Sequence, residues 1–522
     1  MKAPTLDEAV PLLADYLRIS AAAHPDKIAL VCGQQRRTYR ELDERSNAVA
    51  HALIAGGVAR ADRVLIFADN TVETVISFWA VLKAGAIVVL VNPLTKSGKL
   101  GYLIADCRPT AVITDGHLHV AWRDAVQSPH VKLVIVSGKL RDEQAAHLPH
   151  LLHFEAALSA GDHRHAPARR GIDLDLAAII YTSGSTGDAK GVMLTHRNML
   201  TAATSIASYL EMCEDDVVLG VLPLAFDYGL YQMILSFGVG ARLVLERSFT
   251  FPAQVLKTVV AEGVTGFPGV PTIFALMADM PTLGTFDFSK IRFVTNTAAA
   301  LPQKHIAMLQ EIFPRARIYS MYGLTECKRC SYLPPQDIAR KPGSVGIAIP
   351  NTELWIVDEQ DRPVGPRVVG QLVIRGATVM KGYWENPGAT ARKLRPGPVP
   401  GESVLYTGDY CVRDDEGYLY FVGRMDEVFK SRGEKVAPKE VENALCEIPG
   451  VKEAAVFGVP DEVLGNAVKA LVVLARGADW SPKDLQRECQ GRLVNFMVPK
   501  FVEIVAQLPK SPNGKIDKAT LS

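Results

Sequence analysis

A segment rich in small and hydroxylated residues, YTSGSTGDAKGV at residues 181–192, follows the apolar run LAAII. Glycines let the backbone approach a ligand, hydroxyl and N–H groups donate to phosphate oxygens, and the ammonium of Lys190 neutralises charge. The segment is therefore suited to polyphosphate. It is not the common GxxxxGK[ST] loop, because Ala189 precedes Lys190 and Gly191 follows it. A flexible Ser/Gly loop without a ligand is the alternative interpretation.

Further segments along the chain carry residue types that suit a nucleotide site: MYGLTE at 321–326, YTGD at 406–409, GRMDEVFKSRGEKV at 423–436 and LPKSPNGKIDK at 508–518. Taken singly, each has an ordinary explanation. Thr-Glu can begin a helix, YTGD can form a turn, and a lysine near a terminus is usually a solvated charge. They indicate a nucleotide site because they occur together and in this order.

The ordered set resembles the motifs of the adenylate-forming enzymes, which include acyl- and aryl-CoA synthetases, amino-acid adenylation domains and luciferases. The first segment is similar to the phosphate loop of that family, YTSGSTGxPKGV, except that Ala189 replaces proline. Loss of the fixed φ should make the loop more mobile without removing a phosphate contact. In TNTAAALP, at 295–302, alanines replace the two glycines of the family's turn beside adenine and substrate. The added methyl groups should narrow the binding site along this turn.

The resemblance implies a role for each matching residue. The residues implied for binding the ATP phosphates are Thr182, Ser183, Gly184, Ser185, Thr186, Gly187 and Lys190. The residues implied for adenine and ribose are Ala298, Ala299, Tyr322, Gly323, Asp409 and Arg424. The resemblance makes Thr325 a phosphate contact, Glu326 the Mg²⁺ ligand, Lys515 the catalytic lysine and Asp426 the pivot of a hinge, with Lys430 and Gly433 in a mobile loop after it.

The chemistry implied by the resemblance is ATP-dependent activation of a small carboxylic acid. The carboxylate attacks the α-phosphate, giving an acyl-AMP and pyrophosphate, and the acyl group then passes to a pantetheine thiol. The cofactors are ATP and Mg²⁺, and the acceptor is coenzyme A or the phosphopantetheine arm of an acyl or peptidyl carrier protein. A nucleotide-binding pseudoenzyme is a remote alternative, which the retained Lys515, Glu326 and Asp409 argue against.

Selectivity for the acid is expected from LPLAFDYGLYQM, at 222–233, and ECKRC, at 326–330. The expected pocket residues are Phe226, Asp227, Tyr228, Thr297, Cys327 and Lys328. A buried Asp227 would need a cationic partner, which could be a substrate amine or imine, Lys328 or Arg329. Alternatively, Asp227 is a turn or helix-cap residue outside the pocket. An acyl or aryl acid ligase is favoured, with an amino-acid ligase, for example for proline, as the alternative.

Short β-rich apolar runs alternate with helical patterns through the first 380 or so residues, which predicts an α/β fold of layered, mostly parallel sheets. Residues 343–425 show short strands between turns, typical of a small antiparallel, barrel-like subdomain. Residues 426–522 return to helix and strand. We therefore expect a large N-terminal domain at 1–425 and a small, mobile α+β C-terminal domain at 426–522 that carries Lys515.

The composition limits the partners. The 57 basic and 56 acidic residues nearly balance, so charge favours neither nucleic acid nor an anionic membrane. No basic leader or membrane-spanning apolar stretch is evident, so we expect a cytoplasmic protein without stable membrane insertion, which could form a homodimer. The eight cysteines are sparse, and Cys327 and Cys330 lack the second ligand pair that a zinc site needs.

Overall fold

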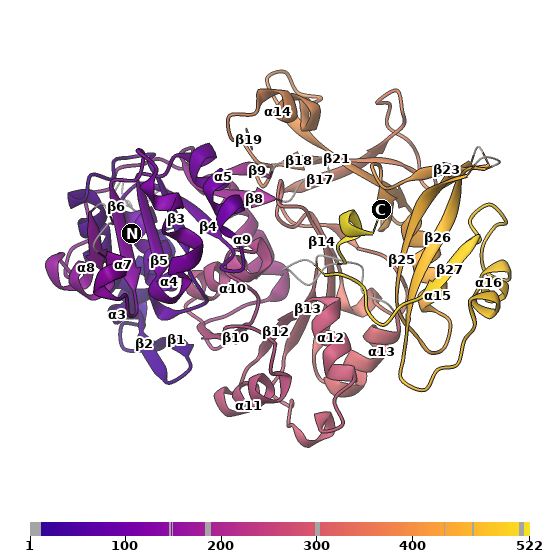
Figure 1. Cartoon of the computed structure of the whole chain (residues 1–522), viewed down its shortest axis with the longest axis horizontal. Coiled ribbons are helices and arrows are strands. Elements are labelled where there is room, and N and C mark those ends of the chain that lie inside the picture. The colour runs from indigo at the N-terminus through magenta and orange to yellow at the C-terminus, as the bar shows by residue number, and fades with distance from the viewer. Residues whose placement is uncertain are drawn as a thin grey trace, which may run out of the picture.

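The structure is a computed structural model that describes residues 12–145, 148, 150–182, 189–297, 303–432, 434–461, 464–510 and 516–521. Figure 1 shows two large sheets with their helices, a smaller antiparallel sheet above them, and a C-terminal unit at one end of the molecule. No helix in the described part of the chain is long and apolar enough to cross a membrane.

An eight-stranded sheet forms the N-terminal half, in the order β19-β9-β8-β4-β3-β5-β6-β7. Its strands from β8 to β7 pair in parallel, while β9 and β19 are antiparallel additions at one edge. The bounds are β3 (Arg63–Phe67), β4 (Ile87–Val91), β5 (Ala111–Asp115), β6 (Leu133–Ser137), β7 (Leu151–His153), β8 (Leu176–Thr182), β9 (Lys190–Thr195) and β19 (Gly382–Tyr383).

A nine-stranded sheet lies beside it, in the order β16-β15-β14-β13-β12-β10-β11-β1-β2. The strands from β14 to β1 are parallel, and antiparallel strands close both edges. The bounds are β1 (Ile28–Cys32), β2 (Gln35–Thr38), β10 (Val217–Gly220), β11 (Arg242–Leu245), β12 (Gly266–Gly269), β13 (Phe293–Asn296), β14 (Arg317–Tyr322), β15 (Ser331–Leu333) and β16 (Ile347–Ala348).

Two helices that are apolar on nearly every side, α4 (Val72–Lys83) and α10 (Asp227–Gly238), belong to the core of this part of the chain. Helices with this pattern need burial all round, and the Trp79 and Phe237 rings bring the two helices together with centroids 5.8 Å apart. Thr195 caps α9 (His196–Leu210) in a capping box with Asn198, so that helix begins directly after β9. The beginning of α9 is thus tied to β9, the strand that carries Lys190.

The remaining helices cover the faces of the sheets or connect strands. Their bounds are α2 (Asp15–Ala23), α3 (Tyr39–Ala55), α5 (Ser97–Cys107), α6 (His119–Trp122), α7 (Asp142–Ala145), α8 (Phe154–Ala160), α11 (Pro252–Glu262), α12 (Pro271–Ala278), α13 (Gln303–Ile312) and α14 (Pro387–Lys393), with 3₁₀ turns η1 (Gly116–Leu118), η2 (Ala125–Gln127), η3 (Leu283–Thr285), η4 (Pro335–Asp337) and η5 (Lys518–Thr520).

The segment expected to be β-rich contains a five-stranded antiparallel sheet. Its strands are β17 (Thr352–Val357), β18 (Gly370–Gly376), β20 (Leu394–Pro396), β21 (Ser403–Arg413) and β22 (Leu419–Arg424). Because β21 and β22 form a hairpin in which Asp409 faces Arg424, two residues predicted to bind ribose become neighbours.

The C-terminal unit has a hydrophobic cluster of its own, built from helices and strands after residue 428. Its elements are β23 (Phe429–Ser431), β24 (Glu434–Val436), α15 (Pro438–Cys446), β25 (Val451–Asp461), β26 (Gly465–Leu474), α16 (Pro482–Gln490) and β27 (Phe501–Ile504). An ion pair between Lys452 and Asp279 connects it to the segment after α12. The mixed α/β class predicted from the sequence is confirmed by these sheets and helices.

Candidate functional site

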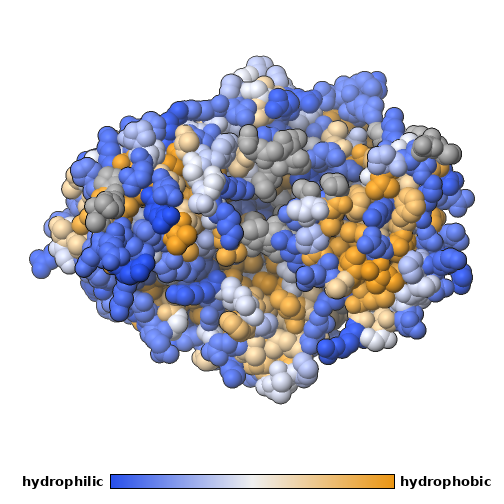
Figure 2. Space-filling model, in the orientation of Figure 1, coloured by the Kyte–Doolittle hydropathy of each residue, from blue (hydrophilic) through white to orange (hydrophobic). Residues whose placement is uncertain are grey.

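Several predicted nucleotide residues lie at the carboxyl ends of strands from both large sheets. β8 ends at Thr182, β13 at Asn296 and β14 at Tyr322. In open α/β sheets, ligands bind outside the carboxyl ends of the strands, where the connections leave a crevice. Figure 2 shows that the surface is hollowed in the middle of the drawn face, between the N-terminal half and the C-terminal unit.

The hairpin of β8 and β9 supports the glycine-rich segment. Thr182 lies opposite Lys190 in the antiparallel register, and the Thr182 hydroxyl is 3.5 Å from the Lys190 carbonyl oxygen. The strands therefore hold the two ends of the segment together and fix where Lys190 leaves the sheet. The predicted phosphate contacts Ser183, Gly184, Ser185, Thr186 and Gly187 lie outside the described residues.

Tyr383 connects this hairpin with the predicted metal ligand. It lies in β19, which pairs with β9 so that Tyr383 faces Val192. Its hydroxyl donates to Oε1 of Glu326 at 2.7 Å, and the Lys190 ammonium lies 5.9 Å from the centre of its ring. Burial, with Glu326 as the next cause, raises the pKa of Tyr383, so the phenol stays neutral and remains a donor. The arrangement places a cation and a carboxylate around one aromatic side chain.

Tyr322 and Asp409 form the second contact between predicted site residues. The Tyr322 hydroxyl donates to Oδ2 of Asp409, and the Tyr322 ring lies 5.8 Å from that of Phe421 in β22. Burial raises the pKa of Asp409 to about 6, although the hydrogen bond from Tyr322 and the charge of Arg424 act in the opposite direction. Arg424 also pairs with the predicted pivot Asp426, with Nε 3.1 Å from Oδ1.

The turn between β14 and β15 carries Thr325, Glu326 and Lys328. It is closed by the hydrogen bond from the Cys330 N–H to the Tyr322 carbonyl at 3.0 Å. A Cβ on Gly323 would lie 1.8 Å from the Lys328 carbonyl oxygen, so only glycine fits there. Cys327 and Cys330 are buried in this turn as free thiols.

The predicted acid pocket lies between this turn and the start of α10. Asp227 is the first residue of α10 and is buried, and within the described residues it makes neither a capping hydrogen bond nor an ion pair with Lys328 or Arg329. Lys328 is fully buried, and burial lowers the pKa of its ammonium to about 8, with Asp227 the main opposing charge. The two charged groups therefore influence each other without a direct contact.

The other described residues predicted for this pocket lie around the start of α10 and the end of β13. Phe226 precedes α10 and is partly buried, with its ring 6.3 Å from that of Tyr228. Tyr228 is fully buried, and its hydroxyl contacts the carbonyl and hydroxyl oxygens of Thr295 at 2.8 and 2.6 Å. Thr297, directly after β13, is also buried. The predicted Ala298, Ala299, Gly433 and Lys515 lie outside the described residues.

Two residues of the site were missed by the sequence analysis. Tyr383 stands in KGYWENP, where aromatic residues interrupt a loop-like composition, and this is the one signal that could have indicated it. Lys393 ends α14, where its ammonium donates to the Thr407 carbonyl. Burial lowers the pKa of Lys393, and the charges of Glu326 and Asp409 raise it, so this lysine lies within the field of both carboxylates.

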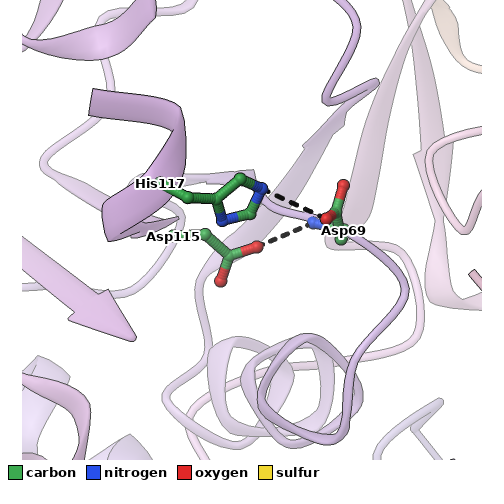
Figure 3. Close-up of side chains that lie close together, drawn as sticks. All are labelled: Asp69, Asp115 and His117. Carbon is green, nitrogen blue, oxygen red and sulfur yellow. Dashed lines mark hydrogen bonds and ion pairs between the residues drawn. The ribbon is translucent and has the colours of Figure 1, made fainter. Parts of the chain in front are cut away.

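A separate group of metal-ligand types, Asp69, Asp115 and His117, lies at the ends of β3 and β5 (Figure 3). The Asp69 N–H donates to Asp115 at 2.9 Å, His117 pairs with Asp69 at 3.2 Å, and the Ser137 hydroxyl donates to Asp115. These contacts use the polar atoms of the group and join the two strand ends.

Two family models of AMP-binding enzymes match this chain. Residues 17–384 match the model of the AMP-binding enzymes, and residues 440–515 match that of the AMP-binding enzyme C-terminal domain. The chain belongs to the AMP-binding enzyme family. The predicted resemblance to the adenylate-forming enzymes is thereby confirmed. The matched regions include the segments at 181–192, 295–302 and 321–326 and the predicted catalytic Lys515, whereas the segments at 406–409 and 423–436 lie between them.

Several relatives of this AMP-binding enzyme are similar over almost their whole length. The long-chain-fatty-acid–CoA ligase of Bacillus subtilis (strain 168) is 31% identical over 97% of this chain and 93% of its own. The structure of the anthranilate CoA ligase AuaEII with anthranoyl-AMP superposes with a TM-score of 0.89 at 26% identity, covering 98% and 96% of the two chains. ATP-bound MatB from Rhodopseudomonas palustris gives 0.85 at 28% identity, covering 97% and 98%.

Gly323→Ala should inactivate the site while leaving the fold in place. The added methyl group collides with a backbone oxygen, so the turn that carries Glu326 and Lys328 must shift. A displacement of about 1 Å can cost about 10²-fold in rate. We expect at least that loss in kcat/KM for acid-dependent pyrophosphate exchange. The control is Gly284→Ala, where no atom lies within 4 Å of the new Cβ. Equal activity of both variants would contradict the prediction.

Asp409→Asn should make stability less sensitive to pH. The folded pKa of about 6 lies above the ordinary 3.8, so the wild type loses stability as pH rises from about 4 to about 6. This difference between the two pKa values corresponds to at most about 3 kcal/mol in the free energy of unfolding. Across this range, the melting temperature of the Asp409→Asn variant should rise relative to that of the wild type as pH increases. The affinity of the variant for ATP should be lower than that of the wild type. A melting difference that does not change with pH would refute this explanation.

Proposed function

We propose that this chain is an ATP-dependent carboxylic acid–CoA ligase, which forms an acyl-AMP with release of pyrophosphate and then transfers the acyl group to a thiol. The observation that carries the proposal is the contact of Tyr383 with both Glu326 and Lys190, beside the hydrogen bond between Tyr322 and Asp409. This arrangement offers a cation for phosphates, a carboxylate for a metal ion and an acidic group for a ribose within one crevice.

The first step requires two anions to meet, because an ionised carboxylate attacks the α-phosphate of ATP. Positioning and charge neutralisation are then the main contributions of the protein, and no general base is needed. Lys190 is suited to the β- and γ-phosphates, since it begins β9 opposite Thr182, at the end of the hairpin that carries the glycine-rich segment. The ammonium of Lys393 donates to the Thr407 carbonyl and interacts electrostatically with Glu326 and Asp409, so it adds a second cation to this site.

Glu326 fits the role of the Mg²⁺ ligand. Carboxylate oxygens are preferred ligands of this ion, and among the described residues the hydrogen bond from Tyr383 goes to Oε1 of Glu326, which leaves Oε2 for a cation. The hydrogen bond fixes the orientation of the carboxylate before any ion binds. Mg²⁺ held there would neutralise phosphate charge during the transfer.

Thr325 and Gly323 take the phosphate and adenine contacts of this site in our proposal, with Thr182 and the segment after it around the pyrophosphate. Tyr322 would pack on the adenine, while Asp409 and Arg424 would bind the ribose hydroxyls. The close register of Asp409 and Arg424 supports this assignment, because one hairpin presents both to the same ligand.

We further propose that residues 426–522 form a mobile domain that turns about Asp426 between the two half-reactions. The separate hydrophobic cluster of this unit supports the proposal, since a unit with its own core can move as one body. The acceptor thiol is that of coenzyme A, and the phosphopantetheine arm of a carrier protein is the second candidate, because both present the same group.

Lys515→Ala should lower acid-dependent pyrophosphate exchange by at least about 10²-fold, because a cation that stabilises the charge at the attacked α-phosphate is lost. Binding of ATP, followed by calorimetry, should change little. Lys510→Ala is the matched control, since Lys510 pairs with Glu453 at 2.6 Å and has no proposed contact with ATP. If the wild type exchanges no pyrophosphate with a broad panel of acids, the ligase proposal fails.

Asp426→Pro should impair thioester formation more than adenylation, because a fixed φ restricts the rotation of the hinge. The two half-reactions are measured separately, as pyrophosphate exchange and as transfer from acyl-AMP to coenzyme A. Asp426→Ala serves as control, because it removes the ion pair with Arg424 but leaves the backbone free. Equal losses in both half-reactions, or equal effects of the two variants, would speak against a hinge at this residue.

A further inference from the structure

The AMP-binding enzyme described here buries two cations that no acidic side chain among the described residues pairs with. Lys328 is 1% exposed, and its ammonium has no hydrogen-bond partner in this part of the chain. Arg329 is 2% exposed, and its Nε likewise has none there. Buried charges are normally paired and hydrogen-bonded, because removing them from water costs several kcal/mol. Two such groups side by side indicate that something outside the described chain completes them.

Both cations lie against the start of α10. The Lys328 ammonium is 5.7 Å from the centre of the Tyr231 ring, and the Arg329 guanidinium is 4.5 Å from that of Tyr228. Tyr231 is one helical turn after Asp227, so these side chains share a face of α10. The turn thus contacts Tyr383 through Glu326 and contacts α10 through Lys328. Two successive parts of this turn therefore join the predicted nucleotide residues around Glu326, the nucleotide side, to the predicted acid-pocket residues around Lys328, the acid side.

The charges on the acid side do not balance. Asp227 is the carboxylate that acts most strongly on Lys328, and within the described residues it forms no ion pair with either cation. Two cations and one carboxylate leave one positive charge in a buried place. The reacting carboxylate of a substrate must reach the α-phosphate on the Glu326 side, so it is not available to balance this charge.

We propose that the acid activated here carries a second anionic group, a distal carboxylate, which binds to Lys328 and Arg329. The substrate is then a dicarboxylic acid. This inference rests on the ligase function proposed above and specifies its substrate class. An unsubstituted alkyl chain would leave both cations without hydrogen bonds. The α-ammonium of an amino acid would add a third cation beside Asp227, which the charge balance disfavours.

The test compares acids that differ only in the distal group. Pyrophosphate exchange is measured with butyrate and succinate, hexanoate and adipate, benzoate and phthalate, and with 6-hydroxyhexanoate and proline. A hydrogen bond to a charged group is worth about 1.5–3 kcal/mol, or roughly 10- to 100-fold. We expect at least one dicarboxylate to exceed its monocarboxylate partner in kcat/KM by about that factor.

Three variants decide whether Lys328 causes the preference. Lys328→Met should lower kcat/KM for the preferred dicarboxylate by about 10- to 100-fold and leave or raise that for the matched monocarboxylate. Lys328→Arg should keep much of the preference, because the charge remains. Asp227→Asn should strengthen the preference, because it removes the repelling carboxylate. Opposite effects of Lys328→Met and Asp227→Asn on the preference are not expected if the substitutions merely disturb packing.

Several outcomes would overturn the proposal. One is a wild-type preference for the monocarboxylate, the hydroxy acid or proline. Another is an equal loss of kcat/KM with all acids in Lys328→Met, which would assign Lys328 to the reacting carboxylate. Exchange with any acid supports the ligase function, so these patterns test the substrate class alone. If no acid supports exchange, the ligase proposal fails, and the melting temperature decides the inference. At least one of the three dicarboxylates should then raise the melting temperature of the wild type but not that of Lys328→Met, and absence of that difference would refute the inference.

Discussion

The hydrogen bond from Tyr383 to Glu326 is the contact on which the arrangement of the site depends. Tyr383 is placed by the pairing of β19 with β9, and β9 also begins with Lys190. One short strand pair therefore sets the positions of a carboxylate and of a cation that belong to different sheets. Because burial keeps the phenol neutral, the donor is retained over the whole physiological pH range, and Glu326 keeps one orientation.

The turn after β14 combines two tasks in a few residues. Glu326 contacts Tyr383, and Lys328 contacts α10, while Gly323 allows the backbone of the turn to approach itself. A change that moves this turn would displace Glu326 and Lys328 together. The tight turn holds Lys328 and Arg329 in place, and the backbone hydrogen bond of Cys330 closes it.

Similarity to other ligases accounts for the nucleotide side better than for the acid side. The Bacillus subtilis relative is named for long-chain fatty acids, whereas this chain buries Lys328, Arg329 and Asp227 where α10 meets the turn. An alkyl chain in contact with unpaired charges gains little from the hydrophobic effect and leaves the desolvation cost in place. The same fold can thus serve acids of different chemistry through a few side chains beside one helix.

The sequence by itself determined the α/β class, the antiparallel character of the segment before residue 425 and the order of the nucleotide motifs. Each of these follows from local periodicity or from short contiguous strings. Only the tertiary structure decided the contacts between Tyr383 and Glu326, 57 residues apart, and between Tyr322 and Asp409, 87 residues apart. It also decided that Lys328 is buried without pairing with Asp227, a question the sequence left open. The physical reason is that strand pairing and burial bring distant residues together, and no local pattern encodes which charge will find a partner.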